Sequence, residues 1–281
     1  MPHGIRWAFN VKEWKPTKVQ WRLCLECVQK EERDRCNRFC YVDDCKSSLV
    51  GQLLMRKAVS ESLLVEYDKI TFARTSSGKP YYLGVNGSNI FFNVSHNGEF
   101  CILASEINVP IGVDVMKIEY RSQKPLSLYF ELMKKQFSSF EWDFISHPGF
   151  EREQLERFFR LWCLKESYVK AIGTGIVCDL STLSFSCKTF SLKNGEITTD
   201  TKLYKNGIHQ NNWKFEESFL NSNHCAAVAL EMKNVEDTMN AVDPKKFDII
   251  SFEELMKNCK PFQNLDEEES FWQIFTSKSE K

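Results

Sequence analysis

The clearest pattern of hydrophobic and polar positions spans residues 160–173. Apolar side chains recur there every three or four positions, which predicts one buried helical stripe. On the neighbouring face Glu166 and Lys170 lie one turn apart, and Gly173 stands where a left-handed residue commonly ends a helix. We expect a helix that is anchored on one side and presents a carboxylate and an ammonium group on the other. The apolar stripe consists of Leu161, Leu164, Tyr168 and Ile172.

Shorter alternating runs on both sides of this helix predict β-strands. Asn97 and Gly98 stand between two of these runs and give a strong hairpin signal. Further helices are expected from the charged residues 30–35 onward, over residues 46–65 and within residues 118–152. The predicted strands cover residues 4–9, 19–28, 70–73, 90–96, 99–104, 111–116, 183–186, 202–204, 213–215 and 224–230.

The mixture of short strands and helices predicts an α+β fold. Residues 100–106 and 224–231 resemble each other faintly, which favours two similar halves, each a small antiparallel sheet packed with helices, and a site in the crevice at their junction. We expect the first half over residues 1–117 and the second half, with a connecting segment, over residues 118–231. Residues 232–281 are expected to form a linker and a C-terminal segment that packs back on the body through its aromatic side chains.

The overall charge is close to neutral, since 37 lysine and arginine residues stand against 38 aspartate and glutamate residues in a chain of 281. No global field therefore draws the chain to nucleic acid or to a membrane surface, and an anionic ligand needs a local cluster of cations. No run of about 18 apolar residues could span a membrane, and residues 1–6 lack the apolar core of a signal peptide. We expect a cytosolic protein without nucleic-acid or membrane partners.

Eleven cysteines raise the question of a metal site. Five of them are closely spaced, and four thiolates at such spacings could bind zinc. The region lacks the glycines of a zinc knuckle, and its alternation suggests a strand, so reduced, buried thiols are the simpler interpretation. The five residues are Cys24, Cys27, Cys36, Cys40 and Cys45.

Asp114 lies in the middle of the predicted strand over residues 111–116, where aspartate is unusual because a buried charge needs a partner. Together with Glu166 it could hold magnesium bound to a phosphorylated ligand, with Lys170 one turn away. Two simpler interpretations stay open. Asp114 could be satisfied by backbone donors, and Glu166 with Lys170 could be a surface pair worth about 0.2–0.5 kcal/mol.

A loop predicted near residues 74–80 combines two cations with hydroxyl and backbone donors. It does not match the pattern G-x-x-x-x-G-K-[ST], which disfavours a P-loop nucleotidase. Arg35 and His96 would add positive charge for a multiply phosphorylated ligand, although the loop also fits a plain surface turn and His96 an ordinary hairpin end. The loop residues are Arg74, Thr75, Ser76, Ser77, Gly78 and Lys79.

Three motifs follow one another along the chain: Asn93-Val94-Ser95-His96, Gly112-Val113-Asp114 and Trp162-x-x-Lys165-Glu166-Ser167-x-x-Lys170-Ala171. In order and spacing they resemble the motifs of the large, surfactin-synthetase-type 4'-phosphopantetheinyl transferases, and the similarity extends over almost the whole chain. The resemblance implies a pseudo-twofold monomer that transfers 4'-phosphopantetheine from coenzyme A to a serine of an acyl or peptidyl carrier domain and releases adenosine 3',5'-bisphosphate. The carriers would be of the fatty acid synthase or aminoadipate-semialdehyde dehydrogenase type, which implies roles in fatty acid synthesis and lysine catabolism.

The resemblance also implies roles for single residues. Asp114 and Glu166 would bind Mg2+, Lys170 would neutralise the pyrophosphate, and Glu166, directly or through a water, would take the proton of the serine, so these three are the candidate catalytic residues. Many relatives carry a second acid two residues after the aspartate, where this chain has Met116, a poor magnesium ligand. The candidate residues for coenzyme A are Arg35, Arg74, Thr75, Ser76, Ser77, Gly78, Lys79, Asn93, Val94, Ser95, His96 and Lys170.

Two other functions are compatible with the same carboxylate pair. A magnesium-dependent phosphohydrolase or nucleotidyl transferase would act without a carrier protein. A scaffold could bind coenzyme A or carrier domains without turnover, although binding alone does not require metal ligands.

Overall fold

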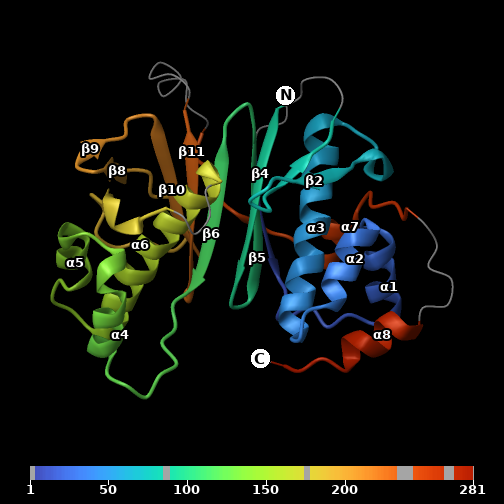
Figure 1. The fold of residues 1–281 in the computed structure, drawn as a ribbon, viewed down its shortest axis with the longest axis horizontal. Helices are drawn as coiled ribbons and strands as arrows, with labels where there is room; N and C mark the ends of the chain where they lie inside the picture. The colour runs from blue at the N-terminus through green and yellow to red at the C-terminus, as the bar shows by residue number, and fades with distance from the viewer. Residues whose placement is uncertain (1–3, 85–88, 174–177, 233–242, 263–268, 281) are drawn as a thin grey trace. The chain divides into compact units, whose positions relative to one another are not determined.

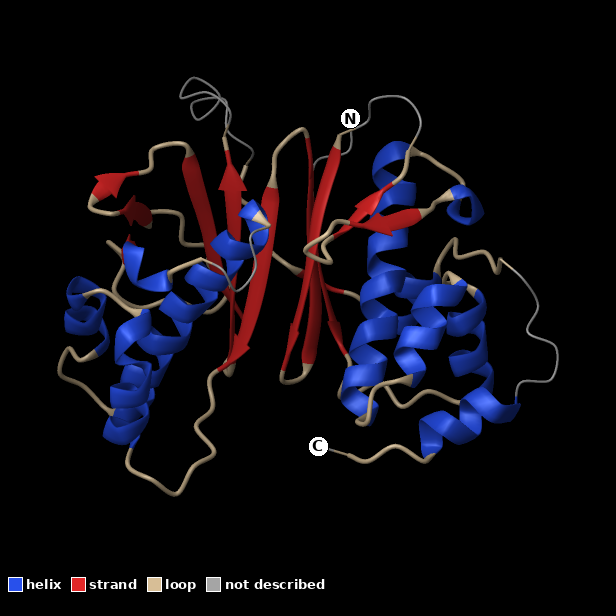
Figure 2. Cartoon of the chain, viewed as in Figure 1, coloured by secondary structure: helices blue, strands red, loops and turns tan. Residues whose placement is uncertain are grey.

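The structure is a computed structural model that describes residues 4–84, 89–173, 178–232, 243–262 and 269–280. Internal contacts divide the chain into two compact units: the first unit contains residues 1–108 and 247–281, and the second unit contains residues 109–246. In each unit helices pack on a small sheet whose strands are largely antiparallel (Figure 2). The predicted α+β fold is confirmed, while the pseudo-twofold relation stays a prediction.

The first unit contains a four-stranded sheet made, in spatial order, of β12 (Asp248–Ile249), β1 (Ile5–Asn10), β5 (Phe100–Ile107) and β4 (Ile90–Asn97). β1 runs parallel to β12 and antiparallel to β5. The hairpin predicted at Asn97 and Gly98 joins β4 to β5, and Gly98 has φ 58°. A separate hairpin consists of β2 (Phe72–Arg74) and β3 (Pro80–Tyr82).

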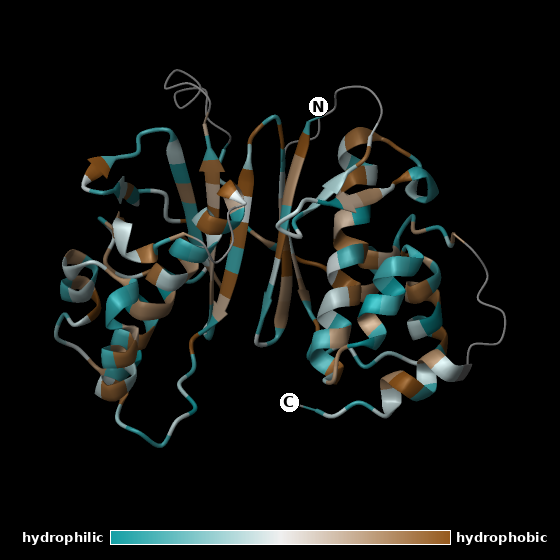
Figure 3. Cartoon of the chain, viewed as in Figure 1, coloured by the Kyte–Doolittle hydropathy of each residue, from teal (hydrophilic) through white to brown (hydrophobic). Residues whose placement is uncertain are grey.

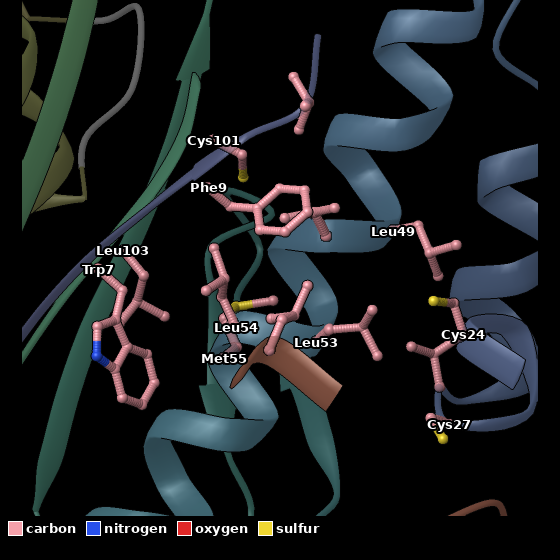
Figure 4. Packing of buried hydrophobic residues seen from close by; sticks show 14 of the residues in the cluster. Trp7, Phe9, Cys24, Cys27, Leu49, Leu53, Leu54, Met55, Cys101 and Leu103 are labelled. Carbon is pink, nitrogen blue, oxygen red and sulfur yellow. The ribbon is translucent and has the colours of Figure 1, made fainter. Parts of the chain in front are cut away.

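Helix α3 (Val42–Leu63) packs on one face of this sheet, and α1 (Lys18–Glu26) and α2 (Lys30–Asn37) pack on α3 (Figure 1). The 3-10 helix η1 (Tyr67–Lys69) follows α3. α3 contacts both β4 and β5 and supplies the centre of the core. Its Leu53 and Leu54 lie near Phe9 and Leu103 of the sheet (Figure 4). Each buried side chain of this size contributes about 1.5–3 kcal/mol to folding.

The run over residues 19–28 was predicted as a strand, and this prediction is wrong because these residues lie in and just beyond helix α1. Thr17 caps the helix: its hydroxyl accepts the N–H of Gln20, and the Gln20 side chain accepts the N–H of Thr17. Trp21, Cys24 and Leu25 are buried at helical spacing. Within a short stretch the same apolar positions also fit the alternation of a strand. The capping box at Thr17 and Gln20 favours the helix.

The C-terminal residues return to the first unit. They form α7 (Phe252–Met256) and α8 (Glu269–Thr276). Phe252 stacks on Trp14 with ring centroids 5.5 Å apart, and Phe275 stacks on Trp21 at 3.9 Å. These aromatic pairs attach the end of the chain to its beginning.

The second unit contains a three-stranded antiparallel sheet made, in order, of β10 (Trp213–Asn221), β11 (His224–Glu231) and β6 (Ile111–Lys117). The long helix α6 (Glu151–Ile172) lies across this sheet (Figure 1) and carries interleaved hydrophobic and hydrophilic residues (Figure 3). The remaining elements are α4 (Leu126–Met133), η2 (Lys134–Gln136), α5 (Ser139–Ile145), η4 (Leu180–Thr182), β7 (Leu183–Ser186), β8 (Lys202–Lys205) and β9 (Ile208–His209).

Strand β6 belongs to the second unit, whereas the sequence suggested a boundary after residue 117. Its backbone pairs with β11, with Asp114 opposite Ala227 and Val113 opposite Val228. Because β6 follows the β4–β5 hairpin closely in sequence, we expected it in the first half. It belongs instead to the second unit, because it pairs with β11, more than a hundred residues later in the chain.

All eleven cysteines are free thiols, and four of the five closely spaced ones, Cys24, Cys27, Cys36 and Cys45, are buried. Burial raises the pKa of the Cys24 thiol. Within the described ranges, no three side chains of His, Cys, Asp or Glu come together in a way that could hold a metal ion. Among the helices that the structure describes, none combines the length and the apolar character needed to cross a membrane.

Candidate active site

Helix α6 presents the central motif on the face predicted from the sequence. Its stripe residues Leu161, Leu164 and Tyr168 are buried in the core of the second unit. The helix ends at Gly173, which has φ 70°, so the predicted left-handed end is confirmed. The partly exposed residues on the neighbouring face are Trp162, Glu166 and Lys170.

Gly112 allows β6 and α6 to approach each other closely. A Cβ atom at this position would overlap the carbonyl oxygen of Ser167 and the backbone nitrogen of Ala171. Glycine inside a strand often marks such an approach of two backbones. Because side chains alternate along a strand, Asp114 points to the same face as Gly112 and therefore toward α6.

Asp114 and Lys170 form an ion pair between these two elements. The Nζ of Lys170 donates to Oδ1 of Asp114 at 2.6 Å. The Asp114 side chain is 5% exposed and that of Lys170 is 29% exposed, so water screens the pair only in part. The structure thus provides the partner that a carboxylate in the middle of a buried strand requires.

Glu166 lies one turn before Lys170, and the charges of both Asp114 and Lys170 affect its pKa. Burial raises the pKa of Glu166, the negative charge of Asp114 raises it further, and the ammonium of Lys170 opposes the shift. Two carboxylates therefore stand near one lysine. The arrangement favours an additional positive charge or a proton at Glu166.

The chemistry of this carboxylate pair suits a hard divalent cation. Carboxylate oxygens are preferred magnesium ligands, and magnesium commonly uses one or two protein carboxylates and fills its other positions with water and phosphate oxygens. A cation between Asp114 and Glu166 would also relieve the repulsion that raises the pKa of Glu166. Met116, two residues after Asp114 on β6, has a soft sulfur and adds no suitable ligand.

The other lysine of the motif has a different environment. The Nζ of Lys165 lies 2.9 Å from Oε2 of Glu141 and donates to the carbonyl oxygens of Leu180 at 2.8 Å and Leu183 at 2.6 Å. Both charged side chains are fully buried. Lys165 therefore fastens α5 and the segment around η4 to the helix that carries Glu166.

The candidate ligand-binding residues of the first unit lie on α2 and on the hairpin β2–β3. Arg35 is exposed near the end of α2. Arg74 ends β2 and pairs with Glu32 of α2, with Nη2 and Oε1 2.6 Å apart. Burial lowers the pKa of Lys79, the last residue of the loop. The structure thus brings the predicted loop to the helix that carries Arg35.

The motif residues of β4 do not share one face. Asn93 and Ser95 alternate with Val94 and His96 along the strand, so the two pairs project to opposite sides. Asn93 and Ser95 are buried, Val94 packs on the hydrophobic core of the first unit, and His96 is exposed. A ligand on either side would therefore meet two of these four side chains.

Three features of the sites were missed by reasoning from the sequence. The close packing at Gly112 had a signal, a glycine inside a β-branched strand. Glu32 and Glu141 had none, since a glutamate at the start of a helix is common and its distant partner cannot be derived from spacing. The candidate residues form two groups, one within each unit.

Comparison with known protein families gives matches to both units. A model described as 4'-phosphopantetheinyl transferase, N-terminal, matches residues 12–108, and a model of the 4'-phosphopantetheinyl transferase superfamily matches residues 110–229. The L-aminoadipate-semialdehyde dehydrogenase-phosphopantetheinyl transferase of Xenopus laevis is 35% identical over 284 residues, which cover 99% of this chain and 93% of the relative.

The protein of the same name from Homo sapiens is 35% identical over 283 residues, which cover 97% of this chain and 91% of the relative. The 4'-phosphopantetheinyl transferase Sfp of Bacillus subtilis is 32% identical over 160 residues, or 57% of this chain and 66% of the relative. The matches include Asp114, Glu166 and Lys170 within the range of the superfamily model. This chain is therefore an enzyme of the 4'-phosphopantetheinyl transferase family.

Proposed function

We propose that the protein transfers 4'-phosphopantetheine from coenzyme A to a serine of acyl or peptidyl carrier domains, with release of adenosine 3',5'-bisphosphate and with a requirement for magnesium. The observation that carries this proposal is the group of Asp114, Glu166 and Lys170 on β6 and α6, in a chain of this family. Two carboxylates and one ammonium group on a rigid support suit transfer of a phosphoryl-linked group.

Asp114 and Glu166 would hold the magnesium ion, since the carboxylate of Asp114 is close enough to Glu166 to raise its pKa. The bound ion would supply positive charge that stabilises the pyrophosphate as it is cleaved. Lys170 already lies 2.6 Å from Asp114, so its ammonium group is placed beside the same carboxylates and can bind a phosphate oxygen.

Glu166 is the candidate general base. In the proposed step the serine oxygen forms a bond to the phosphorus that carries pantetheine, the bond from that phosphorus to the bisphosphate breaks, and the serine proton passes to Glu166 directly or through a water. A raised pKa makes a carboxylate a better proton acceptor. Pre-positioned charge at Lys170 lowers the barrier to departure of the anionic product.

Coenzyme A would be held by local cations, because the whole chain carries a formal net charge of only -1. The proposed binding residues in the first unit are Arg35, the run from Arg74 to Lys79, and the run from Asn93 to His96, with Lys170 in the second. Arginine and lysine side chains are the usual partners of phosphate groups.

The names of the animal relatives suggest the kind of carrier. They are phosphopantetheinyl transferases named for L-aminoadipate-semialdehyde dehydrogenase. We infer that this protein modifies a carrier domain of that type and those of fatty acid synthase. It would act as a monomer in the cytosol.

Intact-mass measurement of an apo carrier domain tests the proposal directly. Incubation with the protein, coenzyme A and magnesium is expected to add one phosphopantetheine arm, and a chelator is expected to prevent the addition because it removes the ion. Boiled protein serves as the control. Release of adenosine bisphosphate without a carrier would instead indicate a phosphohydrolase, and binding of coenzyme A without modification of several carriers would indicate a scaffold.

A further inference from the structure

The hairpin β2–β3 carries the loop proposed to bind coenzyme A, and two side chains hold it to helix α2. Gln29, the residue before α2, accepts the backbone N–H of Phe72 at 2.8 Å and donates to the carbonyl oxygen of Phe72 at 3.4 Å. One turn later, Oε1 of Glu32 accepts from Nε and Nη2 of Arg74 at 3.2 and 2.6 Å. These contacts align β2 with the side of α2.

Arg74 connects Glu32 to the loop itself. Its Nη1 donates to the carbonyl oxygen of Gly78 at 3.0 Å, so three of the five guanidinium N–H groups are directed to the protein. The Glu32 side chain is 14% exposed, and within the described part of the chain its Oε2 is buried without a hydrogen-bond partner. A carboxylate that is largely removed from water in this way needs a paired cation to stabilise its charge, and for Glu32 that cation is Arg74.

The loop between β2 and β3 is ordered by short-range hydrogen bonds. The N–H of Thr75 donates to the carbonyl oxygen of Lys79 at 2.9 Å, the N–H of Gly78 donates to the carbonyl oxygen of Thr75 at 2.8 Å, and the N–H of Lys79 donates to Oγ1 of Thr75 at 3.1 Å. Gly78 has φ 83°, a value that favours glycine. The bond from Arg74 therefore ends at the turn that determines the course of the loop.

Other residues are better placed than Arg74 to supply charge for an anion. Arg35 lies three residues after Glu32 on α2, is exposed, and is therefore its neighbour on the helix surface. Burial lowers the pKa of Lys79, so an anion beside this lysine would favour its charged form. The charge of Arg74 is balanced by Glu32.

We propose that Glu32 is a positioning residue that, through Arg74, fixes the loop over residues 75–79 in the arrangement that receives a phosphate group of coenzyme A. The inference rests on the proposed function, because it specifies how that ligand is bound. It also narrows the set of binding residues proposed above, since Arg74 supports the loop while Arg35 and Lys79 contact the phosphate.

The direction in which Glu32→Ala changes the affinity for coenzyme A distinguishes a positioning role from a purely electrostatic effect. A carboxylate near an anion site repels the ligand, so an effect of charge alone predicts that Glu32→Ala tightens binding. Positioning predicts weaker binding, because the loop loses its support. Glu31→Ala is the matched control, since Glu31 lies in the same first turn of α2 and its removal changes the net charge equally.

Calorimetric titration of the full chain with coenzyme A and with adenosine 3',5'-bisphosphate provides the test. We expect Glu32→Ala to raise the Kd about five- to tenfold and Glu31→Ala to change it less than about twofold. In steady-state assays KM for coenzyme A is expected to rise while kcat stays close to that of the wild type. Unchanged or tighter binding by Glu32→Ala would overturn the role of Glu32.

A second variant separates support from direct contact. If Glu32 acts through Arg74, Arg74→Gln and the double variant with Glu32→Ala each lose about as much affinity as Glu32→Ala alone, because all three remove the same linkage. Additive losses would show that Arg74 contacts the ligand and would overturn the assignment. Failure of the wild type to bind coenzyme A would overturn the proposed function, whereas binding by the wild type with equal binding by Glu32→Ala would overturn only this inference.

Discussion

Lys170 stands near two carboxylates whose environments differ. Asp114 is almost completely buried and is paired with Lys170 at 2.6 Å, while Glu166 is partly exposed and its pKa is raised. Two acidic groups in unequal environments can take different roles in a reaction. Glu166 is therefore the residue whose titration should be visible in both stability and activity.

Glu166→Gln is expected to separate folding from catalysis. The pKa of Glu166 is raised in the folded protein, so protonated Glu166 stabilises the fold relative to the unfolded chain. This contribution to the free energy of unfolding is complete at pH values below the ordinary pKa of glutamate, and it is lost as the pH rises through the raised pKa. At neutral pH without metal, the variant should therefore resist urea as well as the wild type or better, and the difference should vanish below about pH 4. Urea midpoints of both proteins, measured in chelator from about pH 3 to about pH 8, test this.

The same variant should lose about 10²–10⁴-fold in phosphopantetheine transfer, because the carboxylate is assigned to proton transfer. The acidic limb of the pH–rate profile should disappear with it. Glu151→Gln, at the exposed start of the same helix, is the control. Near-normal turnover of Glu166→Gln at saturating magnesium would contradict both roles given to this residue.

Among the elements, the contact of β6 with α6 determines the geometry of the site. Gly112 leaves no room for a side chain between the two backbones, and Asp114 lies two residues further along the same face. Shifting the helix away from the strand would separate Lys170 from Asp114. The support from Lys165 and Glu141 acts on the same helix from another side.

Gly112→Ala is expected to push α6 away from β6. Overpacking of this kind commonly costs about 1–3 kcal/mol, and the displaced lysine should lower transfer activity per folded molecule. Val113→Ala is the control, because Val113 is buried on the opposite face and its truncation costs stability without pushing the helix. Denaturant unfolding and activity are measured on both variants. Equal activity of the two would show that the close approach is not needed for catalysis.

Elements with a single clear period could be predicted from the sequence, whereas a run whose apolar positions fit two periods could not be assigned from that pattern alone. The helix over residues 160–173, the Asn97–Gly98 hairpin and the strand that contains Asp114 are all confirmed. The run over residues 19–28 was assigned to the wrong class because its apolar positions fit two periods. The partners Glu32 and Glu141 could not be found, since they depend on contacts between elements distant in sequence.

On the scale of the whole molecule, the first unit is assembled from both ends of the chain. Residues 247–281 add the edge strand β12 and place Phe252 and Phe275 on Trp14 and Trp21. The sequence predicted that the C-terminal segment packs back through its aromatic side chains. It did not indicate that this segment joins the first unit or that β6 belongs to the second, because strand pairing over long distances leaves no local signature.

Phe275→Ala tests how much the C-terminal segment stabilises the first unit. Phe275 is 7% exposed and stacks on Trp21 at 3.9 Å, so its truncation should lower the free energy of unfolding by about 3–5 kcal/mol. Ile274→Ala, at the neighbouring position with 39% exposure, should cost less than about 1 kcal/mol. Urea unfolding followed by tryptophan fluorescence gives both values. A similar loss for the two variants would contradict the packing described here.

The return of the C-terminal segment also determines the order of events during synthesis on the ribosome. The second unit is continuous from residue 109 to residue 246, so all of it has been made before the strand that completes the first unit emerges. Domains commonly fold as units while the chain is still growing. The unit that carries Asp114, Glu166 and Lys170 can therefore fold before β12, α7 and α8 have been made, whereas the unit that carries Arg35 and Arg74 is complete only after these elements have emerged.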